Sequence, residues 1–332
     1  MNCPALPKLG DIFLKAIITG ATGFVGRYLA DYFLSVGSYE LYGTTYNEPT
    51  PTEATLRKFA DLQNLDVRDK ATVQHLIESI TPDVIIHLAA QTHVPTSYSD
   101  PWATHETNIR GTLNILEAVR LANFMHTRIL IISSAHVYGA VKPDALPIRE
   151  TQPFNPGDPY SVSKVAQDAL GLQYFNTYGL NVVRVRPFNH TGPGQTTQFV
   201  IPNFAMQIAE IEAGLKPPQL NVGNLEAERD FCDVRDVVRA YHLLTTQGQP
   251  GAVYNICSGK PYRLKNLVEQ MIALSGKNIE IKIDPSRFRP LDAPIVYGDF
   301  SALQHDTGWQ PQISIEQTLA DVLNDCRTRV QA

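Results

Sequence analysis

Short apolar runs alternate with longer amphipathic stretches through the first half of the 332-residue chain. The apolar runs have the length of buried strands and cover residues 13–20, 39–45, 83–90, 128–135 and 181–187. The amphipathic stretches have helical periodicity and cover residues 26–37, 71–80 and 106–123. Nearly continuous apolar strands separated by helices are typical of a parallel sheet that is covered on both faces. Because the connections in such sheets are right-handed, the pattern predicts a doubly wound α/β fold.

The pattern changes after Pro187, where Gly- and Pro-rich stretches such as NHTGPGQ (189–195) replace the regular alternation. The apolar run GAVYNICSG (251–259) then indicates a strand that returns to the sheet. We therefore expect a sheet domain with a smaller C-terminal lobe that faces the substrate. The expected parts are the sheet domain at 12–187, its return segment at about 232–257, the lobe mainly at 188–231 and 258–332, and an N-terminal extension at 1–11.

A glycine-rich turn joins the first predicted strand to the first predicted helix. The sequence TGATGFVG places Gly20, Gly23 and Gly26 at G-x-x-G-x-x-G spacing, which differs from the more familiar G-x-G-x-x-G fingerprint. A tight turn, a close backbone approach to a pyrophosphate and free N–H groups at a helix start all favour glycine. The turn predicts dinucleotide binding and hence a Rossmann-type domain; a plain strand-to-helix turn is the alternative.

The end of the second predicted strand bears on the choice of dinucleotide. In many NAD-specific proteins an acidic residue there binds the ribose hydroxyls, but the sequence YGTTYNEP has no carboxylate before Glu48. Arg27, directly after the last glycine, is a candidate for binding a 2′-phosphate, or else an exposed helix arginine. Asp66 is a candidate for the adenine amine, with helix capping as its competing role. We expect NADP(H), with NAD as the alternative.

The segment DPYSVSK begins a long predicted helix. Asp158 is a favourable N-cap, Pro159 suits the first helical position, and Gly179 suits the position just past the helix end. Tyr160 and Lys164 then lie one turn apart on one face of the helix. The pair is a candidate device for proton delivery.

Composition excludes several classes of partner. The net charge is −5 and basic residues form no block, so we expect no nucleic-acid partner. No apolar run approaches the length of a membrane span, and the N-terminus lacks the apolar region of a signal peptide, so we expect a cytoplasmic protein without a membrane partner. The four cysteines are far apart and have no metal-ligand spacing, so we expect free thiols and no metal site.

Seven motifs in order resemble the extended short-chain dehydrogenases/reductases that act on nucleotide sugars. They are TGATGFVG, LDVRD, HLAAQTHVPTSYSDP, NIRGTLNILEA, SSAHVYG, YSVSK and RPFNHTGPGQ. Later segments, including VGNLEAERDFCDVRDVVRAY and RPLDAPIVYGD, look most like the GDP-4-dehydro-6-deoxy-mannose reductases, which are relatives of the GDP-mannose 4,6-dehydratases. The resemblance implies a nucleotide-sugar substrate and NADPH-dependent reduction of its C4 keto group.

The resemblance also implies roles for individual residues. Tyr160 would donate a proton to the C4 carbonyl oxygen, and Lys164 would lower the pKa of Tyr160 and hold the nicotinamide ribose. Ser134 would hydrogen-bond the same oxygen, and Asn108 would either help hold a relay water or serve the structure. Besides the glycines, Arg27, Asp66 and the Tyr160–Lys164 pair, the cofactor would contact Thr22, Phe24, Val25, Val67, Leu88, Ala89 and Ala90.

Substrate binding would involve Ser134, His136, Asn189, Arg229 and Arg289. The two arginines are candidates for the diphosphate because a guanidinium group matches phosphate oxygens, with exposed surface arginines as the alternative. His136 departs from the family pattern, because related dehydratases have a glutamate at this position that acts in removing water. Histidine can also transfer protons, so this departure disfavours dehydration without excluding it.

Three functional hypotheses follow. The first is reduction of GDP-4-dehydro-6-deoxy-D-mannose to GDP-D-rhamnose, and the second is a GDP-mannose 4,6-dehydratase or a nucleotide-sugar epimerase that recycles tightly bound NAD(P). The third is a non-catalytic dinucleotide sensor, which the retention of Tyr160, Lys164 and Ser134 disfavours. By analogy with the family, the helices at 106–122 and 159–178 would pair in a homodimer.

Overall fold

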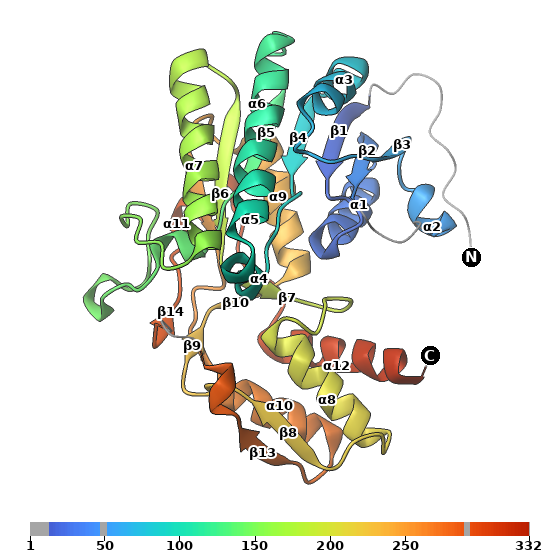
Figure 1. The fold of residues 1–332 in the computed structure, drawn as a ribbon, viewed down its shortest axis with the longest axis vertical. Helices are drawn as coiled ribbons and strands as arrows, with labels where there is room; N and C mark the ends of the chain where they lie inside the picture. The colour runs from blue at the N-terminus through green and yellow to red at the C-terminus, as the bar shows by residue number, and fades with distance from the viewer. Residues whose placement is uncertain (1–12, 47–51, 289–292, 332) are drawn as a thin grey trace.

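The computed structural model describes residues 13–46, 52–288 and 293–331. Seven parallel strands form its main sheet in the order β11-β6-β5-β4-β1-β2-β3 (Figure 1). The strands are β1 (Leu14–Thr19), β2 (Tyr39–Thr45), β3 (Asp61–Asn64), β4 (Val84–His87), β5 (Arg128–Ile132), β6 (Val182–Pro187) and β11 (Val253–Ile256). The strand order reverses beside β1, so the predicted doubly wound sheet is confirmed.

Alternate residues of the central strands supply two separate cores. Ala16 and Ile18 of β1 face one core, whereas Ile17 faces the other, and β4 and β5 alternate in the same way. One face is covered by α1 (Phe24–Val36), α9 (Val234–Gln247) and α11 (Ser301–Thr307), and the other by α3 (Lys70–Ile80), α6 (Gly111–Leu121) and α7 (Pro159–Tyr178). Burial on both faces explains why these strands are apolar throughout.

The helix α7 begins and ends where the sequence predicts. Asp158 caps its start, because the carboxylate accepts hydrogen bonds from the backbone N–H of Ser161 at 2.7 Å and from its hydroxyl at 2.7 Å. Gly179 ends it with a left-handed φ of 71°. This helix places Tyr160 and Lys164 beside the carboxyl ends of the sheet strands.

The predicted helix at 106–123 has a different form. It comprises α5 (Pro101–His105), a π-helical turn η1 (Glu106–Arg110) and then α6. Asn108 lies inside the π turn and is completely buried, with its amide bonded to the backbone of Gln91 and to Ser163 of α7. The wider turn therefore joins α6, α7 and the loop after β4, which periodicity alone does not reveal.

A smaller lobe with its own core follows the sheet (Figure 1). Its elements are α8 (Val200–Glu212), β8 (Gln219–Val222), α10 (Leu264–Ser275), β13 (Glu280–Ile283) and α12 (Ile315–Gln331). Leu303 and Trp309, from the segment 258–332, instead pack in the core of the sheet. The short elements are α2 (Glu53–Leu56), α4 (Val94–Ser99), η2 (Ala135–Tyr138), η3 (Pro143–Ala145), β7 (Asn189–Thr191), β9 (Glu228–Arg229), β10 (Phe231–Asp233), β12 (Tyr262–Arg263), η4 (Pro285–Arg287) and β14 (Ile295–Val296).

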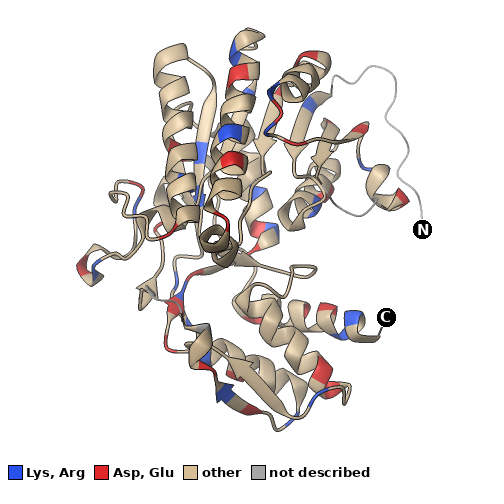
Figure 2. Cartoon of the chain, in the orientation of Figure 1, with Lys and Arg blue, Asp and Glu red and all other residues tan. Residues whose placement is uncertain are grey.

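Charged residues of both signs are interspersed over both lobes (Figure 2). Among the described helices, none combines the length and the apolar character that crossing a bilayer requires. Cys232, Cys257 and Cys326 are buried free thiols.

Candidate active site

One cavity of about 640 Å³ runs along the carboxyl ends of the strands and reaches the smaller lobe. It brings together sixteen of the residues that the sequence nominates: Gly20, Thr22, Gly23, Phe24, Val25, Gly26, Asp66, Val67, Leu88, Ala89, Ala90, Ser134, His136, Tyr160, Lys164 and Asn189. This is the position at which open α/β sheets bind their ligands. Arg27 and Arg229 do not line the cavity, and Arg289 lies outside the described residues.

The glycine-rich turn has the geometry of an anion cradle. Gly20 has a φ of +68°, and a Cβ added at Gly26 would lie 2.5 Å from the carbonyl oxygen of Gly20, so no larger side chain fits there. Gly23 begins α1 without a side-chain cap, which leaves N–H groups of the first turn facing the cavity end lined by this turn. Backbone donors and the helix dipole together favour a phosphate here.

The end of β2 and the loop after β3 line the same cavity as the glycine-rich turn. Thr44, Thr45 and Tyr46 line it together with Asp66. The carboxylate of Asp66 accepts the side chain and the backbone N–H of Arg68, and this pairing lowers the pKa of Asp66. Asp66 does not cap α3, because that cap is Asp69.

Arg27 is exposed, and its Nη2 donates to the carbonyl oxygen of Gly194 at 3.1 Å. Its guanidinium group is therefore held against the loop that follows β7, outside the cavity.

The three candidate catalytic side chains line the same cavity. Tyr160 is only 8% exposed, and Lys164 Nζ lies 5.8 Å from the centroid of its ring. Nζ donates to the carbonyl oxygen of Ile132, at the end of β5, at 2.9 Å. Ser134 follows the same strand, and its Oγ accepts the backbone N–H of His136 at 3.2 Å, so its own proton can be donated to Tyr160 or to a ligand.

Burial shifts the pKa values of both Tyr160 and Lys164. It raises the pKa of Tyr160 to about 12, and the hydrogen bond from Ser134 is what opposes this rise. It lowers the pKa of Lys164 to about 7. The sequence led us to expect Lys164 to lower the pKa of Tyr160; in the structure desolvation of the phenol outweighs any such effect. Tyr160 is therefore protonated at neutral pH.

The remaining candidates differ in what they contact. The ring of His136 packs edge-on against Tyr160 at a centroid distance of 5.7 Å. Asn189 Nδ2 donates to the carbonyl oxygen of Asp230 at 3.1 Å. Arg229 Nη1 donates to the carbonyl oxygen of Glu228 at 2.8 Å. Asn108 does not line the cavity, and its amide is bonded to Gln91 and Ser163.

Several lining residues were not nominated from the sequence. Gln91 and His93 follow β4 within the motif HLAAQTHVP, which was a usable signal. Phe231 and Tyr241 lie within the motif VGNLEAERDFCDVRDVVRAY, which was a usable signal as well, whereas Phe199 lies in none of the motifs.

The sheet, the glycine turn and the grouping of Ser134, Tyr160 and Lys164 are those of an extended short-chain dehydrogenase/reductase. The family model described as GDP-mannose 4,6 dehydratase matches residues 17–322. The chain therefore belongs to the GDP-mannose 4,6-dehydratase family, and it is an enzyme of the extended short-chain dehydrogenase/reductase type. The resemblance predicted from the sequence is confirmed.

Individual relatives agree with this assignment. The chain is 39% identical to GDP-6-deoxy-D-mannose reductase of Pseudomonas aeruginosa over 318 residues, which cover 96% of this chain and 98% of the relative. It is 31% identical to GDP-mannose 4,6-dehydratase of Yersinia enterocolitica, over 93% of this chain and 92% of that protein.

Solved structures give the same picture. The structure of RMD from Pseudomonas aeruginosa complexed with NADPH matches with a TM-score of 0.83 and 38% identity, over 95% of this chain and 99% of that one. UDP-glucose 4-epimerase of Thermus thermophilus, in complex with NAD, matches with a TM-score of 0.83 and 27% identity, over 95% and 99% of the two chains.

Proposed function

We propose that this enzyme reduces the C4 keto group of GDP-4-dehydro-6-deoxy-D-mannose to give GDP-D-rhamnose, with NADPH as the reductant. The observation that carries the proposal is that Tyr160, Ser134 and Lys164 line one cavity with the glycine cradle. The similarity to a GDP-6-deoxy-D-mannose reductase and to a reductase complexed with NADPH supports the choice of sugar and cofactor.

The residues present fit a dinucleotide. The space that a Cβ at Gly26 would fill lets the backbone of the turn approach a pyrophosphate, and the uncapped start of α1 offers N–H donors to it. Val67, Leu88 and Ala89 would line the adenosine half, and Tyr160 with Lys164 would lie at the nicotinamide half. NADPH, when bound, supplies the hydride that the reduction requires.

The protein's own part of the reaction is proton delivery. As C4 gains a hydride, its carbonyl oxygen becomes an alkoxide, and the O–H bond of Tyr160 breaks to give that oxygen its proton. An alkoxide is more basic than a phenolate, so a tyrosine with a pKa near 12 still donates readily. Ser134 would donate a hydrogen bond to the same oxygen, and protonated Lys164 would stabilise the tyrosinate left behind.

Oxidation of a sugar hydroxyl, which is the first step of a dehydratase or an epimerase, needs a tyrosinate as base, whereas reduction needs the protonated phenol. The second candidate function remains a GDP-mannose 4,6-dehydratase, which the family description and the Yersinia enterocolitica relative favour. His136 in place of a glutamate weighs against it.

The smaller lobe, residues 188–231 and 258–332, would hold the sugar nucleotide. Asn189 lines the cavity where the two lobes meet and would contact the diphosphate. His136 lies against Tyr160 and would contact the sugar. Arg229 lies outside the cavity, so it would meet the diphosphate charge only if the lobe closes over the substrate. The role of Arg289 in binding the diphosphate stays a prediction from the sequence, because this residue lies outside the described ranges.

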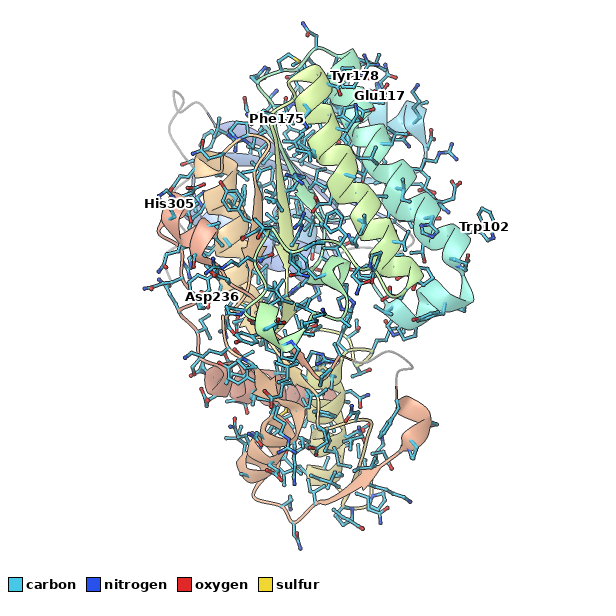
Figure 3. All side chains as sticks on the ribbon, turned by 90° about the vertical axis from the view of Figure 1, so that its left-hand side faces the viewer. Trp102, Glu117, Phe175, Tyr178, Asp236 and His305 are labelled. Carbon is cyan, nitrogen blue, oxygen red and sulfur yellow. The ribbon has the colours of Figure 1, made fainter. Side chains whose placement is uncertain are left out.

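We also propose that the enzyme forms a homodimer through α5, α6 and α7. Figure 3 shows α6 and α7 side by side, with Trp102 pointing away from the ribbon. Large apolar side chains are exposed on these helices: Trp102 at 78%, Leu113 at 37%, Leu121 at 48%, Val162 at 44% and Leu172 at 36%. Light scattering on the wild type and on Trp102→Glu tests this, with a dimer that becomes a monomer as the expected result.

The test of the reaction is a nucleotide-sugar panel with NADPH and with NADH. The keto sugar, generated in situ from GDP-mannose by a separate dehydratase, should cause loss of one NADPH per product molecule. Turnover of GDP-mannose without added cofactor would instead identify the dehydratase. A dinucleotide sensor would bind NADPH but consume none with any sugar of the panel.

A further inference from the structure

An arginine that was not nominated from the sequence does not line the cavity itself but is bonded to two residues that do. Arg68, in the loop between β3 and α3, donates from Nε to Asp66 Oδ1 at 2.9 Å and from Nη2 to Asp66 Oδ2 at 2.7 Å. The same Nη2 donates to the hydroxyl of Tyr46 at 2.9 Å, and the guanidinium carbon lies 5.6 Å from the centroid of the Tyr46 ring. Tyr46 and Asp66 both line the cavity.

These contacts fix the guanidinium group but leave part of it unused. The Nε–H and both hydrogens of Nη2 have acceptors, whereas the two hydrogens of Nη1 have none among the residues that the structure describes. The side chain of Arg68 is 33% exposed, so Nη1 can take an acceptor from a bound ligand. A guanidinium group held in this way loses little further entropy when it binds an anion.

Tyr46, to which Arg68 is bonded, follows β2 and so occupies the position that distinguishes the two nicotinamide dinucleotides. In folds of this type the residue after the second strand meets the ribose of the adenosine, through a carboxylate for NAD or with an arginine nearby for NADP. Here β2 ends at Thr45 and Tyr46 follows, so no carboxylate of β2 stands there. The carboxylate of Asp66 is already paired with Arg68, which removes most of its repulsion toward a phosphate.

We propose that Arg68, held in place by Asp66 and Tyr46, binds the 2′-phosphate of NADPH and so determines the preference of this enzyme for NADPH over NADH. The inference rests on the proposed use of NADPH. It assigns to Arg68 the contact that the sequence suggested for Arg27. Neither arginine lines the cavity, but Arg68 is bonded to Tyr46 and Asp66, which do, whereas Arg27 is bonded to Gly194, which does not.

The test measures binding, not turnover. Dissociation constants for NADPH, NADH and 2′,5′-ADP are obtained by fluorescence titration and calorimetry for the wild type, Arg68→Gln and the control Arg27→Gln. Since hydrogen bonds between charged groups contribute about 1.5–3 kcal/mol, Arg68→Gln should bind NADPH and 2′,5′-ADP about tenfold to hundredfold more weakly, with NADH unchanged. Arg27→Gln should bind all three as the wild type does.

Equal weakening of NADPH and NADH in Arg68→Gln would overturn the proposal, because it would show that Arg68 only supports the loop. Loss of NADPH preference in Arg27→Gln would overturn it as well. Tyr46→Phe keeps the ring and removes one anchor of Arg68, so it should weaken NADPH binding severalfold even if Arg68→Gln does not fold. A wild type that binds both dinucleotides equally would refute the choice of cofactor but leave the reduction of the keto sugar to be judged by its own assay.

Discussion

The catalytic helix α7 is fixed to the sheet by a buried charge network centred on Asp168. This residue lies one turn beyond Lys164 and is 1% exposed. Its carboxylate accepts Arg184 Nη1 at 2.6 Å, Arg186 Nε at 2.8 Å and Arg186 Nη2 at 3.1 Å, and both arginines belong to β6. Asp168→Asn keeps the shape but removes the charge, which leaves two guanidinium groups buried without a counter-ion.

The size of the effect follows from this burial. The side chains of Arg184 and Arg186 are 8% and 4% exposed, so water cannot replace the lost carboxylate. Removing one partner of a buried ion pair typically costs about 3–5 kcal/mol. We therefore expect Asp168→Asn to lower the free energy of unfolding by an amount in that range, measured by urea denaturation at neutral pH.

A matched control is the pair between Arg149 and Asp299, in which the side chain of Arg149 is 73% exposed. Arg149→Gln should cost less than about 1 kcal/mol, because exposed ion pairs contribute little. A loss below about 1 kcal/mol for Asp168→Asn as well would refute the reasoning, since it would mean that the two buried arginines find other partners or water.

Three further predictions concern the active site. Tyr160→Phe should abolish turnover of the keto sugar and leave NADPH affinity unchanged by titration; retained turnover would point to another proton donor. The value of kcat/KM should fall as pH rises through about 7, because the ammonium form of Lys164 is lost above its lowered pKa. The side chain in Lys164→Arg stays charged, so any activity of this variant should fall only at a higher pH. Gly26→Ala should destabilise the protein by about 1–3 kcal/mol and weaken dinucleotide binding, because its Cβ would meet Gly20 O at 2.5 Å, whereas Gly157→Ala, which meets no atom within 4 Å, should change neither.

The sequence predicts most of the sheet because both of its faces are buried, and burial on both faces requires apolar runs. Apolar periodicity does not predict the strand β3, because its sequence DLQN is mostly polar and it lies at the edge of the sheet. The helix α7 was found from Asp158 and Gly179, although its inward face carries buried polar residues such as Lys164 and Asp168. Helix caps can be recognised from neighbouring residues in the sequence, whereas the partners of the buried polar residues of α7 come from distant parts of the chain.

The candidate site was predictable where chemistry follows spacing along the chain. The glycine turn and the Tyr160–Lys164 pair are of this kind. The direction of the Tyr160 pKa was not predictable, because spacing reveals the neighbouring lysine but not the desolvation that dominates. Arg68 was missed for a related reason, since its contact with Tyr46 joins residues 22 positions apart that only the sheet brings together.

The most direct test of the central claim is to follow the hydride. The enzyme is supplied with the keto sugar and with NADPH that carries deuterium at the transferable position of the nicotinamide, and the product is analysed by mass spectrometry and NMR. The proposed reduction predicts one deuterium at C4 of the deoxysugar for each NADPH consumed. Turnover without deuterium at C4 would contradict it and would indicate an enzyme that recycles its own cofactor.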